Sequence, residues 1–480
     1  MVGSILSKHT TYFEVLDALA EDGCPICRLG LRAVSRYFDV LSYEGVNDPG
    51  LRAQLRAARG FCNWHAWQFA EEVHDGLGAA IIYRDILGTL LGILDSLWGR
   101  APVGESGSGR SLFEVPTGQK RGAAAGDRLA ARRRCPACHS LADSSQRYLD
   151  TLLAHLAESE FYEQYSASDG LCAPHLAMGL RRVRTSRDLE LLIAAFAQRR
   201  ISPWTGLSAP ALSPAVLIET MVGKEGAIPR APAVANDSSA DQSLEISLAI
   251  PLLGTAVDGD SCPVCRSAIS AVDEWLGAVS APQDLAFLCN AHAWRFLSIG
   301  KKTVVTLWQP WARAIADTLQ SLPPAQEQTP ATWRRLFALF KEPAARRVGA
   351  TAAARLTPEG QCLACQIQRA GERLATAAIL ERSRQRQPDL RNPFGLCLPH
   401  FALALESAAN RQEERALLSS QIEILRKLRA ELSEYIRKQD YRFRHEPLAG
   451  EADSPWRAIA QVAGAKGLCG YGLGKYAASL

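Results

Sequence analysis

The sequence lacks the long apolar run that a transmembrane helix needs. No stretch reaches the roughly 18 apolar residues of a membrane span. The best candidate, AAIIYRDILGTLLGILDSLW (79–98), contains Arg84, Asp85 and Asp95, so we expect an amphipathic helix there. The N-terminus, MVGSILSKHTTYFEVLDALAEDG, has no continuous apolar core of a secretion signal. We therefore expect a cytoplasmic protein with no membrane span.

The familiar catalytic motifs are also missing. We find no G-x-S-x-G elbow, P-loop, dinucleotide-binding glycine motif or H-E-x-x-H, so hydrolase and transferase chemistry has little support and whether the chain is an enzyme stays open. The net charge of +4 is too small to indicate a partner. The basic cluster RRVRTSR (181–187) has no interleaved aromatic residues and is typical of a solvated helix face, so nucleic acid is not an expected partner.

Cysteine is the informative residue. Twelve of the 13 cysteines form four sets, each a CxxC pair followed by a CxxH pair after 34, 33, 23 or 31 residues. In chain order the sets are Cys24, Cys27, Cys62 and His65; Cys135, Cys138, Cys172 and His175; Cys262, Cys265, Cys289 and His292; and Cys362, Cys365, Cys397 and His400. Cys469 is left over, and we expect a free thiol there.

This pattern indicates metal coordination. Two ligands separated by two residues can face one ion from a tight turn or a first helical turn, and two such pairs make a four-coordinate Cys3His site. Thiolates favour zinc or an iron–sulfur cluster over calcium or magnesium. Disulfides would not require a histidine three residues after every third cysteine, and they are rare in a chain with no export signal. All sixteen residues are therefore candidate metal ligands, one site per set.

The surrounding sequence is helical in period, and alternating β patterns are scarce, which predicts an all-α fold. The ligand pairs are expected at or just before helix N-termini, since proline follows the first cysteine in three CxxC motifs. FCNWHAW (61–67) resembles LCNAHAW (288–294), and GLCAPHLA (170–177) resembles GLCLPHFA (395–402). The order is thus A-B-A′-B′, an internal duplication of a two-site unit.

We expect four modules separated by linkers, and each half to pack by itself, with 1–200 and 250–480 folding alone. The predicted modules are 1–98 (A), 131–201 (B), 246–341 (A′) and 361–480 (B′). The predicted linkers, rich in small residues, Gly or Pro, are 99–130, 202–245 and 342–360. The last module ends in a long helix and an Arg/aromatic segment (420–447), which we expect to pack on the bundle surface.

CPxC followed by LCxxH, with the closing YIRKQDYRFRHEP…SPWRAI, resembles an uncharacterised bacterial and archaeal family of cysteine-rich, mostly helical proteins. Members of that family typically hold one two-site unit, and this chain would hold two. Leu363 departs from the CPxC pattern but leaves the ligands intact. The family implies no activity.

Two functions remain. In the first, four closed Cys3His sites hold structural zinc in a scaffold or adaptor that binds partner proteins. In the second, up to four [4Fe–4S] clusters carry electrons, each held by three thiolates and one imidazole. The sequence favours zinc, because a closed Cys3His set is a common structural-zinc pattern.

Overall fold

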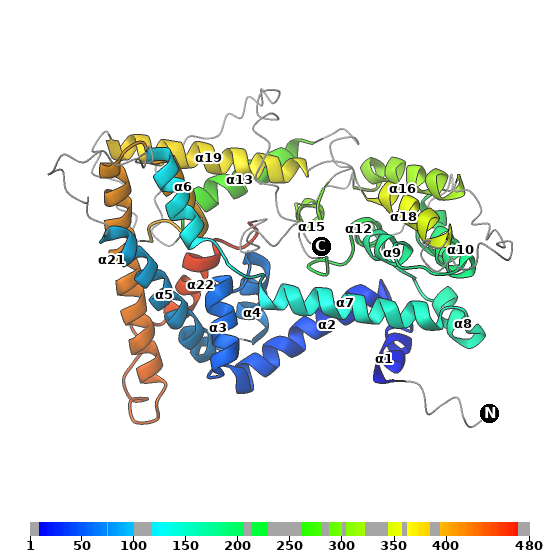
Figure 1. Ribbon diagram of the computed structural model, residues 1–480, viewed down its shortest axis with the longest axis horizontal. Coiled ribbons are helices and arrows are strands. Elements are labelled where there is room, and N and C mark those ends of the chain that lie inside the picture. The colour runs from blue at the N-terminus through cyan, green and yellow to red at the C-terminus, as the bar shows by residue number, and fades with distance from the viewer. Residues whose placement is uncertain are drawn as a thin grey trace, which may run out of the picture. The chain divides into compact units, whose positions relative to one another are not determined.

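A computed structural model describes residues 9–73, 75–99, 118–205, 213–228, 261–279, 288–299, 304–321, 344–357, 362–384 and 394–468. Every secondary-structure element in these ranges is a helix, which confirms the predicted all-α fold (Figure 1). Cys469 lies outside the described residues.

The chain forms two compact units, and each is built from segments of both sequence halves. Unit 1 consists of Met1–Ser35, Ser140–Arg230 and Trp275–Ala364. Unit 2 consists of Arg36–His139, Ala231–Glu274 and Cys365–Leu480. Unit 1 thus takes the beginning and end of the first half and the middle of the second half. Unit 2 takes the reciprocal segments.

The helices of unit 1 surround two of the predicted ligand sets. They are α1 (Thr10–Leu19), most of α2 (Pro25–Val40) and of α7 (Pro136–His155), α8 (Ser159–Ala167), α9 (Ala173–Leu180), α10 (Ser186–Phe196), the π-helical η3 (Ala197–Ile201), α11 (Ser202–Thr205), α12 (Pro214–Val222), α15 (Asn290–Ser298), α16 (Val304–Gln320) and α18 (Ala344–Leu356). Within this unit α9 packs against α18, and α12 packs against α15 and α16.

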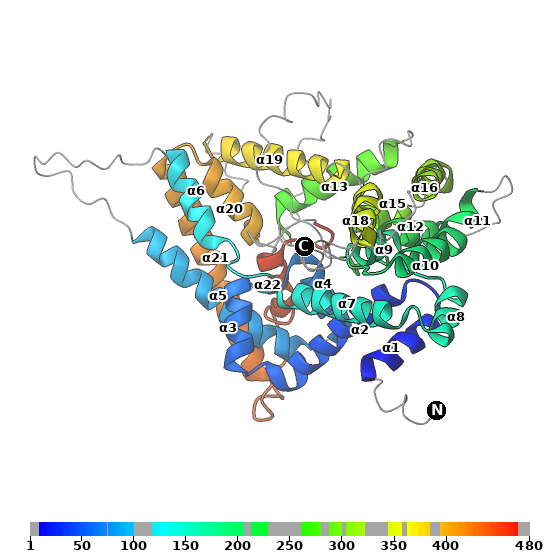
Figure 2. The ribbon, with the colours of Figure 1, turned by 45° about the vertical axis from the view of Figure 1, so that its right-hand side comes forward.

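Unit 2 contains the counterparts of these helices. They are η2 (Leu41–Gly45), α3 (Pro49–Ala58), α4 (Asn63–Val73), α5 (Gly76–Trp98), α6 (Gly118–Leu129), most of α13 (Pro263–Ala278) and of α19 (Leu363–Arg384), α20 (Leu398–Ser407), α21 (Arg411–Lys438) and α22 (Ser454–Ala463). Here α20 packs against α6, and α22 packs against α4 and α5, the same contacts as in unit 1 with the halves interchanged. Figure 2 shows α5 beside α21 and α13 beside α19.

The expected division into consecutive modules and linkers is wrong. The predicted linker 99–130 contains α6, 202–245 contains α11 and α12, and 342–360 contains α18. These stretches carry the composition of linkers because their helices are short and rich in alanine, glycine or proline. The expectation that each half packs by itself is also wrong, since both compact units combine the two halves.

Two glycines at matching positions allow helices from the two halves of the sequence to pack closely within each unit. A Cβ on Gly122 of α6 would lie 2.2 Å from the carbonyl oxygen of Leu405 in α20, and one on Gly349 of α18 would lie 2.2 Å from that of Leu180 in α9. Both pairs join one half of the sequence to the other. The helices approach backbone to backbone, which only a residue without a side chain allows.

The apolar segment 79–98 lies in α5, which is long and apolar enough to cross a membrane by length and composition. Ten of its residues are buried, and it packs against α3, α21 and α22 of unit 2. Its apolar face is thus accounted for by packing within unit 2, as predicted for an amphipathic helix.

The Arg/aromatic segment after α21 folds back on the end of that helix. Arg437 of α21 makes ion pairs with Glu434 and Glu446, and its guanidinium lies 4.5 Å from the ring centre of Phe443. Lys438 donates to the carbonyl of Pro447. The segment therefore folds back on the end of its own helix, while Tyr441 is 82% exposed, and its packing on the bundle surface stays a prediction.

Candidate metal centres

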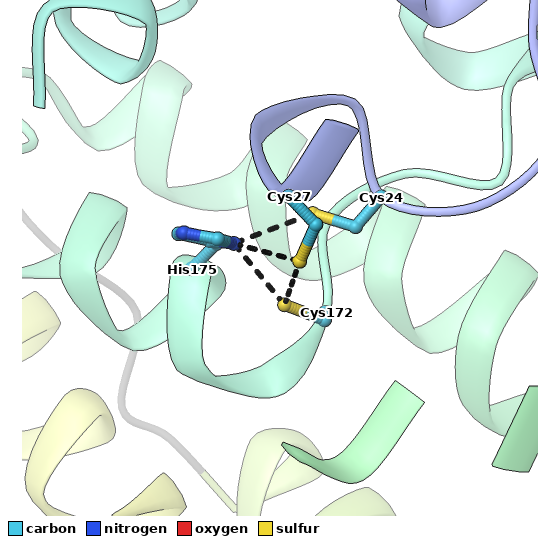
Figure 3. Close-up of side chains that lie close together, drawn as sticks. All are labelled: Cys24, Cys27, Cys172 and His175. Carbon is cyan, nitrogen blue, oxygen red and sulfur yellow. Dashed lines mark hydrogen bonds between the residues drawn. The ribbon is translucent and has the colours of Figure 1, made fainter. Parts of the chain in front are cut away.

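The sixteen predicted ligands form four groups, in each of which the ligand atoms all lie within 4.8 Å of one another. Site I consists of Cys24, Cys27, Cys172 and His175 (Figure 3). The Nδ1 atom of His175 lies 3.5 Å from the sulfur of Cys24, 3.4 Å from that of Cys27 and 3.3 Å from that of Cys172. The sulfurs of Cys27 and Cys172 are 3.6 Å apart. Three sulfurs and one nitrogen thus face a common centre.

Site III repeats this geometry with the equivalent residues of the second half, Cys262, Cys265, Cys397 and His400. The Nδ1 atom of His400 lies 3.4, 3.3 and 3.2 Å from the three sulfurs, in that order. The sulfurs of Cys265 and Cys397 are 3.5 Å apart.

The other two groups consist of Cys62, His65, Cys135 and Cys138 (site II) and of Cys289, His292, Cys362 and Cys365 (site IV). In site II the His65 Nδ1 atom lies between 3.2 and 3.7 Å from the three sulfurs. In site IV the His292 Nδ1 atom lies 3.4 Å from the sulfur of Cys289 and 3.4 Å from that of Cys362.

The predicted grouping of these ligands within modules is wrong. Each CxxC pair joins the CxxH pair of the neighbouring module of the same half, so Cys24 and Cys27 meet Cys172 and His175 and not Cys62 and His65. Helix length explains the exchange. At 1.5 Å per residue, the part of α2 from Cys27 to Val40 carries the chain about 20 Å from Cys27. The 10 residues of α3 bring it back by at most about 15 Å.

Each ligand pair opens a helix, as the sequence predicted. Cys172, Cys289 and Cys397 are the N-cap residues of α9, α15 and α20. The first cysteine of each CxxC pair directly precedes the first residue of α2, α7, α13 or α19. Two helix N-termini therefore point at every site, and their dipoles favour thiolate ligands.

Burial separates site IV from the other three. All ligands of sites I, II and III are buried, whereas Cys289 and Cys365 of site IV are half-buried. A buried thiolate needs a compensating positive charge. A cation could supply this charge in the first three sites in particular.

The pKa values of two thiols in site I are shifted in opposite directions. Burial opposes ionisation of Cys24, but its contacts with Cys172 and Cys27 and the charge of His175 hold its pKa well below the usual range. Burial and the contacts with Cys172 and Cys24 raise the pKa of Cys27 well above it. A cation at the centre would displace the remaining thiol protons, because metal binding deprotonates cysteine ligands.

In sites II and III, too, the pKa of one cysteine is lowered. Contacts with Cys135 and Cys138 lower the pKa of Cys62, although burial raises it. Burial disfavours the charged form of His65, yet the charge of Cys62 raises its pKa to about 10. In site III the pKa of Cys262 is also lowered, against the effect of burial, by its contacts with Cys265 and Cys397.

The repeated phrase GLCxPH has a structural reason at each letter. Gly170 and Gly395 both have φ of +69°, a left-handed conformation that favours glycine. The leucines that follow, Leu171 and Leu396, are buried. The cysteine is both N-cap and ligand, and the proline lies in the first helical turn, where its missing N–H costs nothing. The histidine is the fourth ligand.

The shared CNxHAW phrase binds a loop from the other half of the chain. The amide of Asn290 donates to the carbonyls of Val222, Gly223 and Lys224, and the Trp294 indole donates to that of Gly223. These acceptors are the last residue of α12 and the two residues after it. In unit 2 the corresponding Asn63 and Trp67 bind the carbonyls of 463–465, which follow α22.

The same two loops also contact the metal-site sulfurs. The backbone N–H of Lys224 donates to the sulfur of Cys27 at 3.4 Å, and that of Ala465 donates to the sulfur of Cys265 at 3.4 Å. Each loop therefore connects a site of its own half to a CNxH helix of the other half. Sequence reasoning missed these loops. The available signal was the likeness of SPAVLIETMVGKEG (213–226) to SPWRAIAQVAGAKG (454–467).

Comparison with known proteins supports the duplication. The profile of a family of unknown function (DUF6062) matches residues 7–196 and again 247–467. An "Uncharacterized 23.9 kDa protein in xynA 3'region" of Caldicellulosiruptor sp. (strain Rt8B.4) is 41% identical over 73 residues. That match covers 15% of this chain and 35% of the relative. No solved structure matches. The two matches show a family of unknown function present twice in this chain, in agreement with the expected internal repetition.

Proposed function

This chain belongs to DUF6062, a family of unknown function, and we propose that it is a scaffold protein held together by four structural zinc ions. The observation that carries the proposal is the four Cys3His groups, each of which joins ligand pairs far apart in the sequence. Zinc is bound tetrahedrally by such donor sets, and with four protein ligands it has no open position for a substrate.

The spacing of the ligand atoms supports a single ion at each site. Zn–S bonds of about 2.3 Å and Zn–N bonds of about 2.0 Å in a tetrahedron separate two sulfurs by about 3.8 Å, and sulfur from nitrogen by about 3.5 Å. One pair of sulfurs in each of sites I, II and III is 3.5–3.6 Å apart, and the sulfur–nitrogen distances range from 3.2 to 3.7 Å. Each ligand of a [4Fe–4S] cluster binds a different iron, which spreads the ligand atoms around the cluster. Four atoms within 4.8 Å favour one ion over a cluster.

The described pockets support a scaffold role over catalysis. A pocket of about 490 Å³ in unit 1 is lined by residues of α1 and α7 and their flanks, and it includes none of the sixteen ligands. A smaller pocket in unit 2, of about 170 Å³, lies between Gly122 and the α20–α21 connection. These pockets lie apart from the metal groups, and we propose that the metal groups stabilise the fold and that the surface binds partner proteins.

Metal analysis tests the proposal. Protein purified without chelator or oxygen should contain about four zinc ions per chain and be colourless. Removal of zinc by a strong chelator should abolish most helical circular dichroism, since metal binding and folding are coupled at such sites. Brown protein that contains iron and sulfide, and that bleaches on reduction, would replace the scaffold with the electron-transfer function. Protein with one metal ion or none would overturn both.

Partner binding has a separate test. Affinity purification from cells should recover the same partner proteins with the wild type and with Tyr43→Ser. This control variant changes an exposed side chain and leaves the metal groups intact. Recovery should be lost with Cys172→Ser, because site I then loses its metal and its local fold. Equal recovery with all three proteins would contradict a role for the zinc-dependent fold in partner binding.

A further inference from the structure

Sites I and III are equivalent in the duplication, but the halves differ at two buried positions after the second CxxC pair of each half. The tenth residue after the first cysteine of CPAC (135–138) is Ser145, and the tenth after that of CLAC (362–365) is Glu372. Ser145 lies on α7 in unit 1, and Glu372 lies on α19 in unit 2. Both side chains are buried.

In site III the carboxylate lies on the far side of the ligand imidazole from the thiols. The Oε1 atom of Glu372 is 3.5 Å from the Nε2 atom of His400, while the Nδ1 atom of His400 faces the three sulfurs. The two side chains are 3% and 0% exposed. The amide of Gln368 donates to the same Oε1 atom at 2.8 Å. Both contacts hold the carboxylate in one orientation.

Physical chemistry gives this arrangement a role. A carboxylate without water is costly unless it is paired or hydrogen-bonded. An imidazole that binds a cation through Nδ1 must keep its proton on Nε2, and the cation makes that N–H a stronger donor. A carboxylate that accepts it fixes the ring orientation and the tautomer and raises the basicity of the ligand nitrogen.

Site I has no counterpart of this carboxylate in the part of the chain that the structure describes. The Nε2 atoms of His175 and His400 are both buried without a hydrogen bond of full geometry, but of the two only His400 has a described carboxylate oxygen 3.5 Å away, and the hydroxyl of Ser145 is buried without a partner. The first half also has Leu141 at the position of Gln368, so the residue that orients the carboxylate is replaced as well. The two sites therefore have the same ligands and different surroundings.

We propose that Glu372 is a positioning residue for His400, and that it makes site III bind its metal more tightly than site I. The inference rests on the proposed metal-binding function. Outer carboxylates of this kind typically change metal affinity by 10- to 100-fold. The duplicated halves thus carry equivalent sites of unequal affinity.

The test is a zinc competition titration of the full chain against a chromogenic chelator. Glu372→Gln keeps the size of the side chain and removes its charge, and we expect one of the four zinc ions to bind 10- to 100-fold more weakly. In the background of Cys397→Ser, which disables site III, Glu372→Gln should have no further effect. The Nε2–H proton of His400 in the zinc-loaded protein, observed by NMR, should move upfield in Glu372→Gln.

Two control variants separate positioning from packing. Ser145→Ala should leave all four affinities unchanged. Gln368→Leu removes the other partner of Glu372 and should weaken site III less than Glu372→Gln does. If Gln368→Leu weakens the site as much as Glu372→Gln, or if Glu372→Gln leaves all four affinities and the NMR signal unchanged, the inference is wrong. Wild-type protein that binds no metal would instead overturn the proposed function.

Discussion

Unit 1 and unit 2 are built on one plan from opposite halves of the chain, and they differ most at sites IV and II. The chain between CxxC and CxxH has 23 residues in the second half and 34 in the first. Unit 2 therefore contains η2 and α3 between α2 and Cys62, whereas only ten residues separate Ala278 from Cys289.

The end of α3 hydrogen-bonds to the chain segment that precedes Cys135 of site II. Arg59 has φ of +57° and is buried, and its guanidinium donates to the carbonyls of Arg128 and Leu129, just before Cys135. The N–H of Arg132 donates to Ala57. Cys289 and Cys365 of site IV are half-buried, whereas all four candidate ligands of site II are buried.

The linings of the two sites differ as well. In site II the ring of Phe38 packs against those of Phe61 and Phe69, with ring centres 5.4 Å apart in both pairs, and lies 6.4 Å from that of His65. The positions of Phe38 and Phe61 are Leu276 and Leu288 in the second half. The two units thus share the same candidate ligands and the same combination of segments from both halves. The side chains packed around the ligands differ between them.

Separation of the two sequence halves should have the largest effect, because each compact unit combines segments of both halves. Fragments 1–245 and 246–480 should fail to form stable monomers when expressed alone, since each lacks the middle or outer segments that complete both units. Co-expressed, they should purify as one complex with the full metal content. A protease site inserted near residue 238 should yield a nicked protein that stays together on size exclusion. Two independently folded, monomeric fragments would contradict the exchange.

Loss of one ligand should damage one unit and spare the other. Cys172→Ser should remove one of the four metal ions and the local order of α9, because binding and folding are coupled there. The other three sites should keep their metal, since distant sites behave nearly independently. Elemental analysis and hydrogen exchange measure both effects, and Cys397→Ser is the matched change in unit 2. Loss of all four ions from either variant would show that the sites are not independent.

The next largest effect is expected from substitutions at the two glycines where helices of the two halves meet. Gly122→Ala and Gly349→Ala each force a methyl group against a backbone carbonyl, and each should lower the free energy of unfolding by about 1–3 kcal/mol. Gly92→Ala in α5 is the control, because a Cβ there meets no atom within 4 Å. The control should be neutral or stabilising by up to about 1 kcal/mol, the helix preference of alanine. Equal effects of the three substitutions in denaturant unfolding would refute the close approach.

The smallest effect concerns the rate of metal release. A chelator should remove the ion of site IV first, because Cys289 and Cys365 are half-buried. Arg59→Ala should make site II release its ion faster, by weakening the support before Cys135. Arg52→Ala, which removes an ion pair with Asp85 on the other side of α3, is the control. If Arg59→Ala leaves the release kinetics unchanged, the difference between the sites has another cause.

The sequence was sufficient to predict the sixteen residues that form the four candidate metal groups, the helices they begin and the duplication, because these depend on short spacings and on internal repetition. The pairing of CxxC with CxxH was predicted wrongly because it depends on the lengths of α2 and α7, which carry the chain away from the first pair. The loops after α12 and α22 were missed because 202–245 has the composition of a linker. Glu372 gave no local signal, since its partner His400 is 28 residues away.

The reciprocal exchange of segments has a consequence for assembly. A polypeptide with a single copy of the unit could satisfy the contacts of its CNxH helix and of its loop together only by pairing with a second molecule, and that pairing would depend on protein concentration. In this chain both copies are covalently joined, so the association is intramolecular and the effective concentration is set by the connecting segment. Dilution that would dissociate a dimer leaves this protein intact.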